Sequence, residues 1–184
     1  MTRPNEQHAS ARDALEILRA DHARIKVLFR DFASLGDDDD DDRQRKAELV
    51  DEICYEIIVH GMIEEEIFYP AVRAVSDDQD LVDEADVEHA GVRELVSQLE
   101  VMYPGDDHFD AIVTVLGEEL EHHMDKEENA MFIAARAGGL DLRALGVQLA
   151  ARKEALADDL TAPPESMDAN IPHEGTRSMP RAPN

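Results

Sequence analysis

The pattern His-x-x-x-Glu-Glu occurs twice, each time within a stretch that has the apolar spacing of an α-helix. The first copy begins at His60 and the second at His123, sixty-three residues later. Side chains four residues apart on a helix are separated by roughly 40° around the axis and about 6 Å along it. His60 and Glu64 therefore project from one stripe, as do His123 and Glu127. An imidazole and a carboxylate aimed at one point form half of a metal site, and the other half must come from elsewhere in the chain.

Four long stretches carry apolar residues at spacings of three, four and seven, which is typical of amphipathic helices. They are predicted at about 10–35, from near 43 to shortly before 76, between the turn at 77–78 and the breaker at 104–107, and at about 109–136. A fifth, shorter helix is predicted at 140–160, and no stretch alternates as a strand would. The predicted fold class is therefore all-α: an up-down-up-down four-helix bundle with a short extra C-terminal helix.

One bundle domain is expected over residues 10–160, between a flexible N-terminus at 1–9 and a disordered tail at 161–184 that is rich in Pro, Ser, Asn and charge. Ser10 with Asp13 resembles a helix N-terminal capping arrangement. The six consecutive acids from Asp37 to Asp42 repel one another, and we expect them to form a solvated loop.

The composition limits the classes of molecule that the chain can bind. Forty-three Asp and Glu against 18 Lys and Arg give a net charge of −25, which would repel nucleic acid and anionic membranes. The single cysteine, Cys54, allows neither an intramolecular disulfide nor a thiolate cluster. Because the chain shows neither a signal peptide nor an apolar run of membrane-spanning length, we expect a cytoplasmic protein. We expect it to be a monomer or a homodimer.

Each long helix also places one or two polar residues on its apolar stripe: His22, His60, Glu64, His89, His123 and Glu127. Burying such groups costs several kcal/mol each unless they are paired or ligated, and six together indicate a metal site. A lone His precedes each His-x-x-x-Glu box, by 38 residues in one half and 34 in the other. Two helix pairs related by a pseudo-two-fold axis would give two metal ions similar ligand sets, with carboxylates free to bridge them.

The ligand types narrow the choice of metal. Imidazole and carboxylate without thiolate suit iron or manganese and could accept zinc, whereas calcium and magnesium prefer oxygen alone. We expect two iron ions, because an open di-iron site in a dry helical core can bind and activate oxygen species.

The same residues resemble the hemerythrin-like family, which contains the HHE cation-binding domain. The resemblance covers roughly residues 10–136 and is carried by Asp21-His22, His60-x-x-x-Glu64-Glu65, Glu88-His89 and His123-x-x-x-Glu127-Glu128. It implies a non-haem di-iron centre with an oxo or hydroxo bridge, ligated by the six inward residues. Within that set, the resemblance implies that Glu64 and Glu127 bridge the two ions.

The chain departs from the oxygen-carrying hemerythrins at two positions. Ala85 stands where they have a second third-helix histidine, and the last-helix histidine is followed by Glu at four residues instead of Asp at five. One ion is therefore short of a ligand, which disfavours reversible oxygen carriage. Tyr69 could replace the ligand as a phenolate, although an ideal helix would turn it roughly 180° away from His60 unless Pro70 distorts the turn. The alternative is a tyrosine packed at the end of the bundle.

The neighbouring polar residues are expected to have supporting roles. Asp21 and Glu88 could orient imidazoles, and Glu65 and Glu128 are expected to face solvent or to support neighbours by hydrogen bonds. The adjacent His122 lies roughly 100° from His123, so we expect it to be exposed or in the surroundings of the site.

These features favour a di-iron protein that reacts with hydrogen peroxide, O2 or nitric oxide, with a possible catalase-like or nitric-oxide-consuming activity. The alternatives are an oxygen or iron binding, storage or sensing protein without turnover, and a purely structural bundle.

Overall fold

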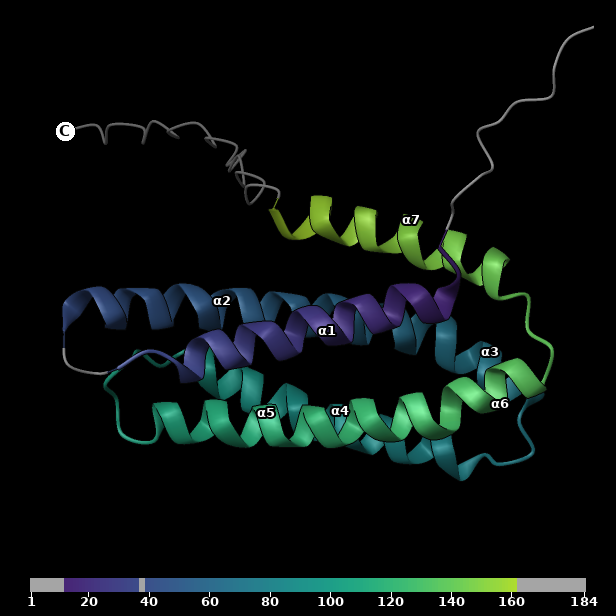
Figure 1. The fold of residues 1–184 in the computed structure, drawn as a ribbon, viewed down its shortest axis with the longest axis horizontal. Coiled ribbons are helices and arrows are strands. Elements are labelled where there is room, and N and C mark those ends of the chain that lie inside the picture. Colours follow the sequence, from purple (N-terminus) through teal and green to yellow (C-terminus); the bar gives the residue numbers. More distant parts are fainter. Residues whose placement is uncertain (1–11, 37–38, 162–184) are drawn as a thin grey trace, which may run out of the picture.

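A computed structural model of the chain describes residues 12–36 and 39–161, which form helices and contain no strand (Figure 1). The elements are α1 (Ala14–Ala33), α2 (Asp40–Ile63), η2 (Glu64–Phe68), α3 (Tyr69–Val75), α4 (Asp80–Leu99), α5 (Phe109–Lys126), η3 (Glu127–Met131), α6 (Phe132–Ala137) and α7 (Leu142–Thr161). The segments η2 and η3 are π-helical turns that join α2 to α3 and α5 to α6 without a break. The predicted all-α bundle is therefore confirmed, with α1, α2–η2–α3, α4 and α5–η3–α6 as its four rods.

The apolar core is divided into two clusters. The first lies toward α3, α6 and α7 and includes Leu15, Leu18, Phe68 and Phe132. The second lies toward the other end of the bundle and includes Ile25, Ile53, Val96 and Leu116. The inward polar residues lie where each helix passes from one cluster to the other, so a buried polar layer stands between two apolar regions.

The first two helices begin differently from the sequence prediction. Asp13 is the N-cap of α1, where its carboxylate accepts the Glu16 N–H at 2.9 Å and Glu16 accepts the Asp13 N–H in return. The predicted partner Ser10 lies outside the described residues. The acidic run is only partly a loop, because Asp39 caps α2 and Asp40 to Asp42 form its first turn. Acidic side chains are favourable there, since the helix N-terminus carries partial positive charge.

The C-terminal helix is not short, since α7 has 20 residues, as many as α1. It packs on α1 and α2, and its Leu149 and Leu156 are buried in the first core cluster. At Gly146 an added Cβ would lie 2.3 Å from the Arg12 carbonyl oxygen, so only glycine permits this approach of α7 to the start of α1. The helix is thus an integral part of the packed structure.

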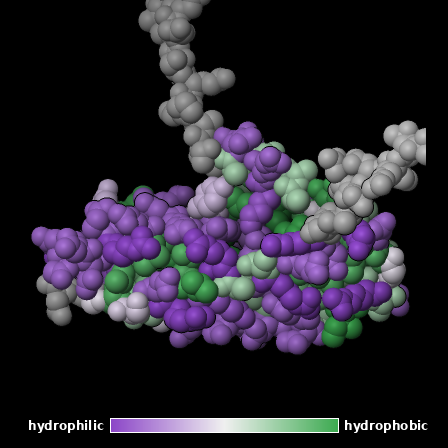
Figure 2. Space-filling view, turned by 45° about the horizontal axis from the view of Figure 1, so that its top comes forward, coloured by the Kyte–Doolittle hydropathy of each residue, from purple (hydrophilic) through white to green (hydrophobic). Residues whose placement is uncertain are grey.

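The surface and the ends of the chain complete the description. Hydrophilic residues predominate on the face in Figure 2, and hydrophobic residues appear there in smaller, separate areas. Within residues 12–36 and 39–161, no helix is long and apolar enough to cross a membrane. The predicted flexible N-terminus and, apart from Thr161, the predicted tail lie outside the described residues.

Candidate metal centre

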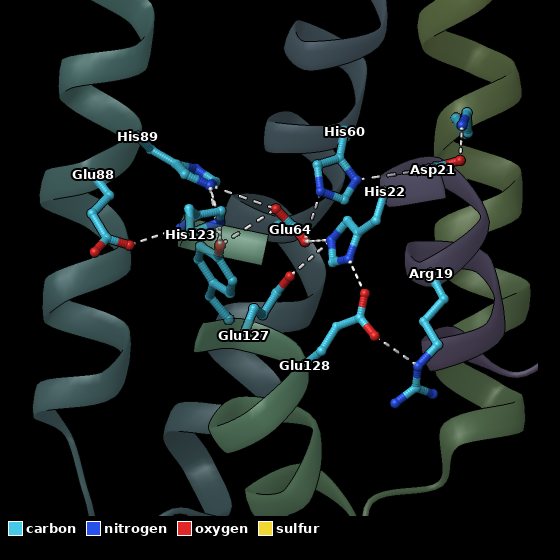
Figure 3. Close-up of polar contacts among 12 residues, drawn as sticks. Arg19, Asp21, His22, His60, Glu64, Glu88, His89, His123, Glu127 and Glu128 are labelled. Atoms are coloured by element: carbon cyan, nitrogen blue, oxygen red, sulfur yellow. Dashed lines mark hydrogen bonds and ion pairs between the residues drawn. The ribbon is translucent and has the colours of Figure 1, made fainter. Parts of the chain in front are cut away.

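The six inward residues meet in one buried layer in the middle of the bundle, and none is more than 6% exposed (Figure 3). They form two groups whose potential ligand atoms lie within 4.8 Å of one another: His22, His60, Glu64 and Glu127, and then Glu64, His89 and His123. Glu64 belongs to both groups. The structure therefore brings together every residue of the predicted ligand set, as two adjoining clusters joined by one carboxylate.

Glu64 directs one oxygen to each cluster. Its Oε1 lies 3.1 Å from His60 Nε2 and 4.0 Å from His22 Nε2, while its Oε2 lies 3.6 Å from His89 Nε2. Glu127 Oε2 lies 3.1 Å from His22 Nε2. A carboxylate shared in this way has the orientation needed to bridge two cations.

Several inward atoms have no hydrogen-bond partner among the described residues: Nε2 of His22 and of His60, Oε1 of Glu64, and both carboxylate oxygens of Glu127. Buried polar atoms normally find a partner, because leaving one unsatisfied costs about 1–3 kcal/mol. A cation placed among these lone pairs would satisfy them together, so the donor set fits a metal ion.

The outer nitrogens of the four imidazoles face carboxylates, as the predicted supporting roles require (Figure 3). Three Nδ1 atoms lie 2.8 Å from a carboxylate oxygen: those of His22 with Glu128, His89 with Glu65, and His123 with Glu88. The fourth pair, His60 Nδ1 and Asp21 Oδ2, is longer at 3.7 Å. Such partners fix the tautomer and ring orientation of metal-binding histidines, so Nε2 is left pointing to the centre.

Each of these four carboxylates also pairs with a basic side chain. Arg19 bonds Glu128 at 3.1 Å, Lys126 bonds Glu88 at 2.7 Å, and Arg93 pairs with Glu65. Lys153 of α7 bonds Asp21 at 2.5 Å. The sequence prediction missed all four basic residues and assigned no site contact to the fifth helix, because these side chains lie off the apolar stripes.

The π-helical turns correct the predicted position of Tyr69. In η2 the Tyr69 N–H donates to the carbonyl of Glu64, five residues back, so the wider turn shifts Tyr69 onto the inward face. Pro70 follows directly and would press on a carbonyl in a regular α-helix. However, η3 makes the same wide turn without a proline, so proline is not required for it. A prediction that assumes the α-helical period of 3.6 residues cannot reveal the inward shift of Tyr69.

The hydroxyl of Tyr69 lies among the atoms of the second cluster. It is 3.1 Å from His89 Nε2 and 3.3 Å from both His123 Nε2 and Glu64 Oε2. A metal with bonds of about 2.0–2.2 Å separates neighbouring ligand atoms by roughly 3.0–3.5 Å. The three distances from the Tyr69 hydroxyl fall within this range, so this oxygen lies where a further ligand of the same cation could stand.

The two halves of the site differ at the aromatic residue that follows each π-helical turn. Phe132 occupies the place in the second half that Tyr69 has in the first, sixty-three residues apart. The Phe132 ring stacks on His22, with centroids 5.9 Å apart, whereas Tyr69 is tilted against His89 at 5.4 Å. One cluster can thus use a phenolic oxygen, and the other has an apolar wall instead.

Burial and close contact change the pKa values of the titratable groups in this layer. Burial lowers the pKa of His60 to about 4, so its imidazole is neutral, the form that binds metals. Burial next to Glu127 raises the pKa of Glu64 well above its usual value. Burial alone would also raise the pKa of Glu127, but its contacts with His22 outweigh that effect and lower it. A bound cation would oppose this rise in the pKa of Glu64, because it favours the carboxylate form.

A cavity of about 370 Å³ adjoins the second cluster, between α2 and α4 with α5 as its floor. Its inner wall includes His60, His89 and His123, and its mouth includes Arg93 and Glu100. This cavity gives small molecules a route to the buried layer.

The remaining residues considered from sequence lie outside the ligand groups. His122 is exposed on the outer side of α5, and Cys54 is half-buried. Ala85 is buried beside His123 and Glu127 and brings no ligand atom, whereas the Tyr69 hydroxyl lies within hydrogen-bond distance of His89 and His123.

Comparison with known proteins gives three matches. The hemerythrin HHE cation binding domain family matches residues 13–135. A crystal structure of a hemerythrin HHE cation binding domain-containing protein from Mycobacterium kansasii superimposes with a TM-score of 0.69 and 27% identity, over 80% of this chain and 89% of that one. A protein from Nostoc sp. described as a DNA nickase is 27% identical over 124 residues, which span 66% of this chain but only 33% of that protein.

Proposed function

This chain belongs to the hemerythrin HHE cation-binding domain family, and from that premise we propose that it is a non-haem di-iron protein that reacts with hydrogen peroxide, O2 or nitric oxide. The observation that supports this proposal is the pair of buried clusters that share Glu64. The lone pairs of their atoms converge, and the charge of the surrounding carboxylates is balanced by basic residues.

We assign His22, His60 and Glu127 to one iron and His89, His123 and Tyr69 to the other. Glu64 would hold both ions, one through each oxygen, whereas Glu127 is grouped only with His22, His60 and Glu64 and would therefore serve the first ion. Imidazole, carboxylate and phenolate together suit iron better than calcium or magnesium, which prefer all-oxygen sites. When bound, such an iron pair supplies electron transfer and coordination sites for small oxygen or nitrogen oxide ligands.

The chain's own residues hold and shield this site. Glu128, Glu65, Glu88 and Asp21 face the Nδ1 atoms and orient the imidazoles, so that every Nε2 points inward. The apolar clusters on both sides exclude bulk water from the layer, which strengthens each electrostatic contact within it. The cavity that ends at His89 and His123 makes this half the accessible one.

Peroxide consumption tests the proposal. Iron-loaded protein should release oxygen from hydrogen peroxide, and consumption of nitric oxide can be followed in parallel with an electrode. His60→Ala should abolish turnover, because it removes a ligand, whereas His122→Ala should leave it unchanged, because that imidazole is exposed. Equal rates in the His60→Ala variant and the parent would overturn the proposal.

Other outcomes identify the alternatives. A stable and reversible oxygen-bound spectrum without peroxide consumption would indicate a binding, storage or sensing protein. Less than one iron per chain after loading would indicate a structural bundle. We do not propose DNA nicking, because this chain spans a third of that relative and its net charge of −25 would repel phosphate.

A further inference from the structure

The cavity beside the second cluster is larger than the small gases and peroxide require. Its volume is about 370 Å³, whereas a water molecule occupies about 30 Å³ in the liquid, and diatomic molecules are of similar size. An apolar cavity of about 150 Å³ already accommodates benzene. The space beside the imidazoles is therefore roughly two and a half times that of a cavity that holds one aromatic ring.

The walls of the cavity are mostly apolar: Ile57, Ile58, Met62, Val92, Val96 and Leu120. Four of them, Ile57, Val92, Val96 and Leu120, keep 3–5% exposure, whereas Ile53 and Leu116 in the adjoining core have none. This small exposed fraction indicates that the four side chains face open space. Such walls favour an apolar occupant, because they offer a hydrated molecule few partners for its hydrogen bonds.

Gly61 keeps the inner end open. A Cβ at this position would meet only the His89 ring, at 3.7 Å, so the wall is formed here by backbone and an imidazole edge. A molecule in the cavity would consequently touch His89 and lie beside His60 and His123.

The charges at the mouth disfavour an anionic occupant. Arg93 is already paired with Glu65, and Glu100 adds a further negative charge to the rim. The net charge of −25 also repels anions over a longer range. A neutral molecule experiences none of this repulsion.

We infer that this cavity is a binding site for a neutral, largely apolar organic molecule, about the size of a bicyclic aromatic, held against the imidazoles of the second cluster. That the bound molecule is a substrate rests on the proposed function, since the metal would lie directly beyond His89 and His123. Binding to the cavity itself does not depend on metal.

Indole fluorescence tests the inference, because indole is a neutral bicyclic molecule and the chain contains no tryptophan. Titration of metal-free protein should shift indole emission to shorter wavelength, with a Kd below about 1 mM. Val96→Phe and Ile58→Phe fill the cavity from opposite walls and should each weaken binding by about tenfold or more. Val87→Phe, on the exposed side of α4, is the matched control and should change Kd by less than about twofold.

Iron-loaded protein gives the second readout, since iron next to bound indole quenches its emission. No binding by the parent below about 1 mM, or equal affinity in all four proteins, would overturn the inference. Binding without quenching, in protein that contains iron, would overturn the placement against the imidazoles. Failure to load iron would count against the proposed function alone, because the metal-free titration still decides whether the cavity binds.

Discussion

Replacing Lys153 by methionine should weaken metal binding, although Lys153 lies on α7, beyond the region matched by the family. Its ammonium bonds Asp21 Oδ1 at 2.5 Å, and the other oxygen of Asp21 faces Nδ1 of His60 at 3.7 Å. Methionine keeps the apolar stem of the side chain and removes the charge. The perturbation therefore acts on His60 through Asp21, and packing changes little.

The expected loss of stability in Lys153→Met follows from the burial of the ion pair. The Asp21 side chain is 10% exposed and that of Lys153 is 31% exposed. Breaking a fully buried pair costs about 3–5 kcal/mol, but water can reach the lysine, so we expect about 1–3 kcal/mol in the free energy of unfolding. Loss of a partner that orients a metal-binding histidine typically lowers metal affinity by about 10- to 100-fold, and we expect a value in that range.

Competition with a chelator measures the affinity, and thermal unfolding of the metal-free protein measures the stability. Lys153→Arg should restore most of the affinity, because it returns a positive charge to Asp21. Arg152→Met is the matched control on the same helix: its partner Glu66 is 41% exposed and its contacts are with Arg152, away from the imidazoles. That change should cost under about 1 kcal/mol and leave metal affinity unaltered. Equal metal affinity in Lys153→Met and Arg152→Met would refute the reasoning.

Three further results are expected. Tyr69→Phe should retain two iron ions per chain but lose visible charge-transfer absorption, and a spectrum identical to the parent's would show that the phenol is not a ligand. Glu88→Gln should lower metal affinity by about 10- to 100-fold in chelator competition, whereas Glu84→Gln, which removes the other carboxylate bonded to Lys126, should not. Because burial raises the pKa of Cys54 to about 11, its thiol should react with iodoacetamide at pH 8 about 100-fold more slowly than free cysteine; a comparable rate would contradict its burial.

Sequence periodicity was sufficient to predict the bundle and its inward face. Leu15, Leu18 and Ile25 share a stripe with His22, and the same logic placed the other five polar residues in one layer. Local charge was less informative: the run from Asp40 to Asp42 repels itself as a free segment but is stabilised as the first turn of α2 by the partial charge of the helix end.

The rest of the site depends on geometry that a regular repeat does not encode. Tyr69 reaches the layer because η2 adds a residue to one turn, and nothing in a period of 3.6 predicts where that insertion occurs. Lys153 reaches Asp21 because α7 folds back onto α1, which is a tertiary contact between residues 132 positions apart. Glu65 and Glu128 were expected either to face solvent or to support neighbours by hydrogen bonds, and the structure shows the second role, at Nδ1 of His89 and of His22.

Iron content is the measurement that tests the central claim most directly. Purified protein loaded anaerobically with ferrous iron and freed of excess metal should contain two iron ions per chain, and Glu64→Ala should reduce this number because both clusters share that carboxylate. Two ions in the parent and a loss in the variant are the predicted result. One ion or fewer in the parent, or two in both proteins, would contradict a dinuclear centre bridged by Glu64.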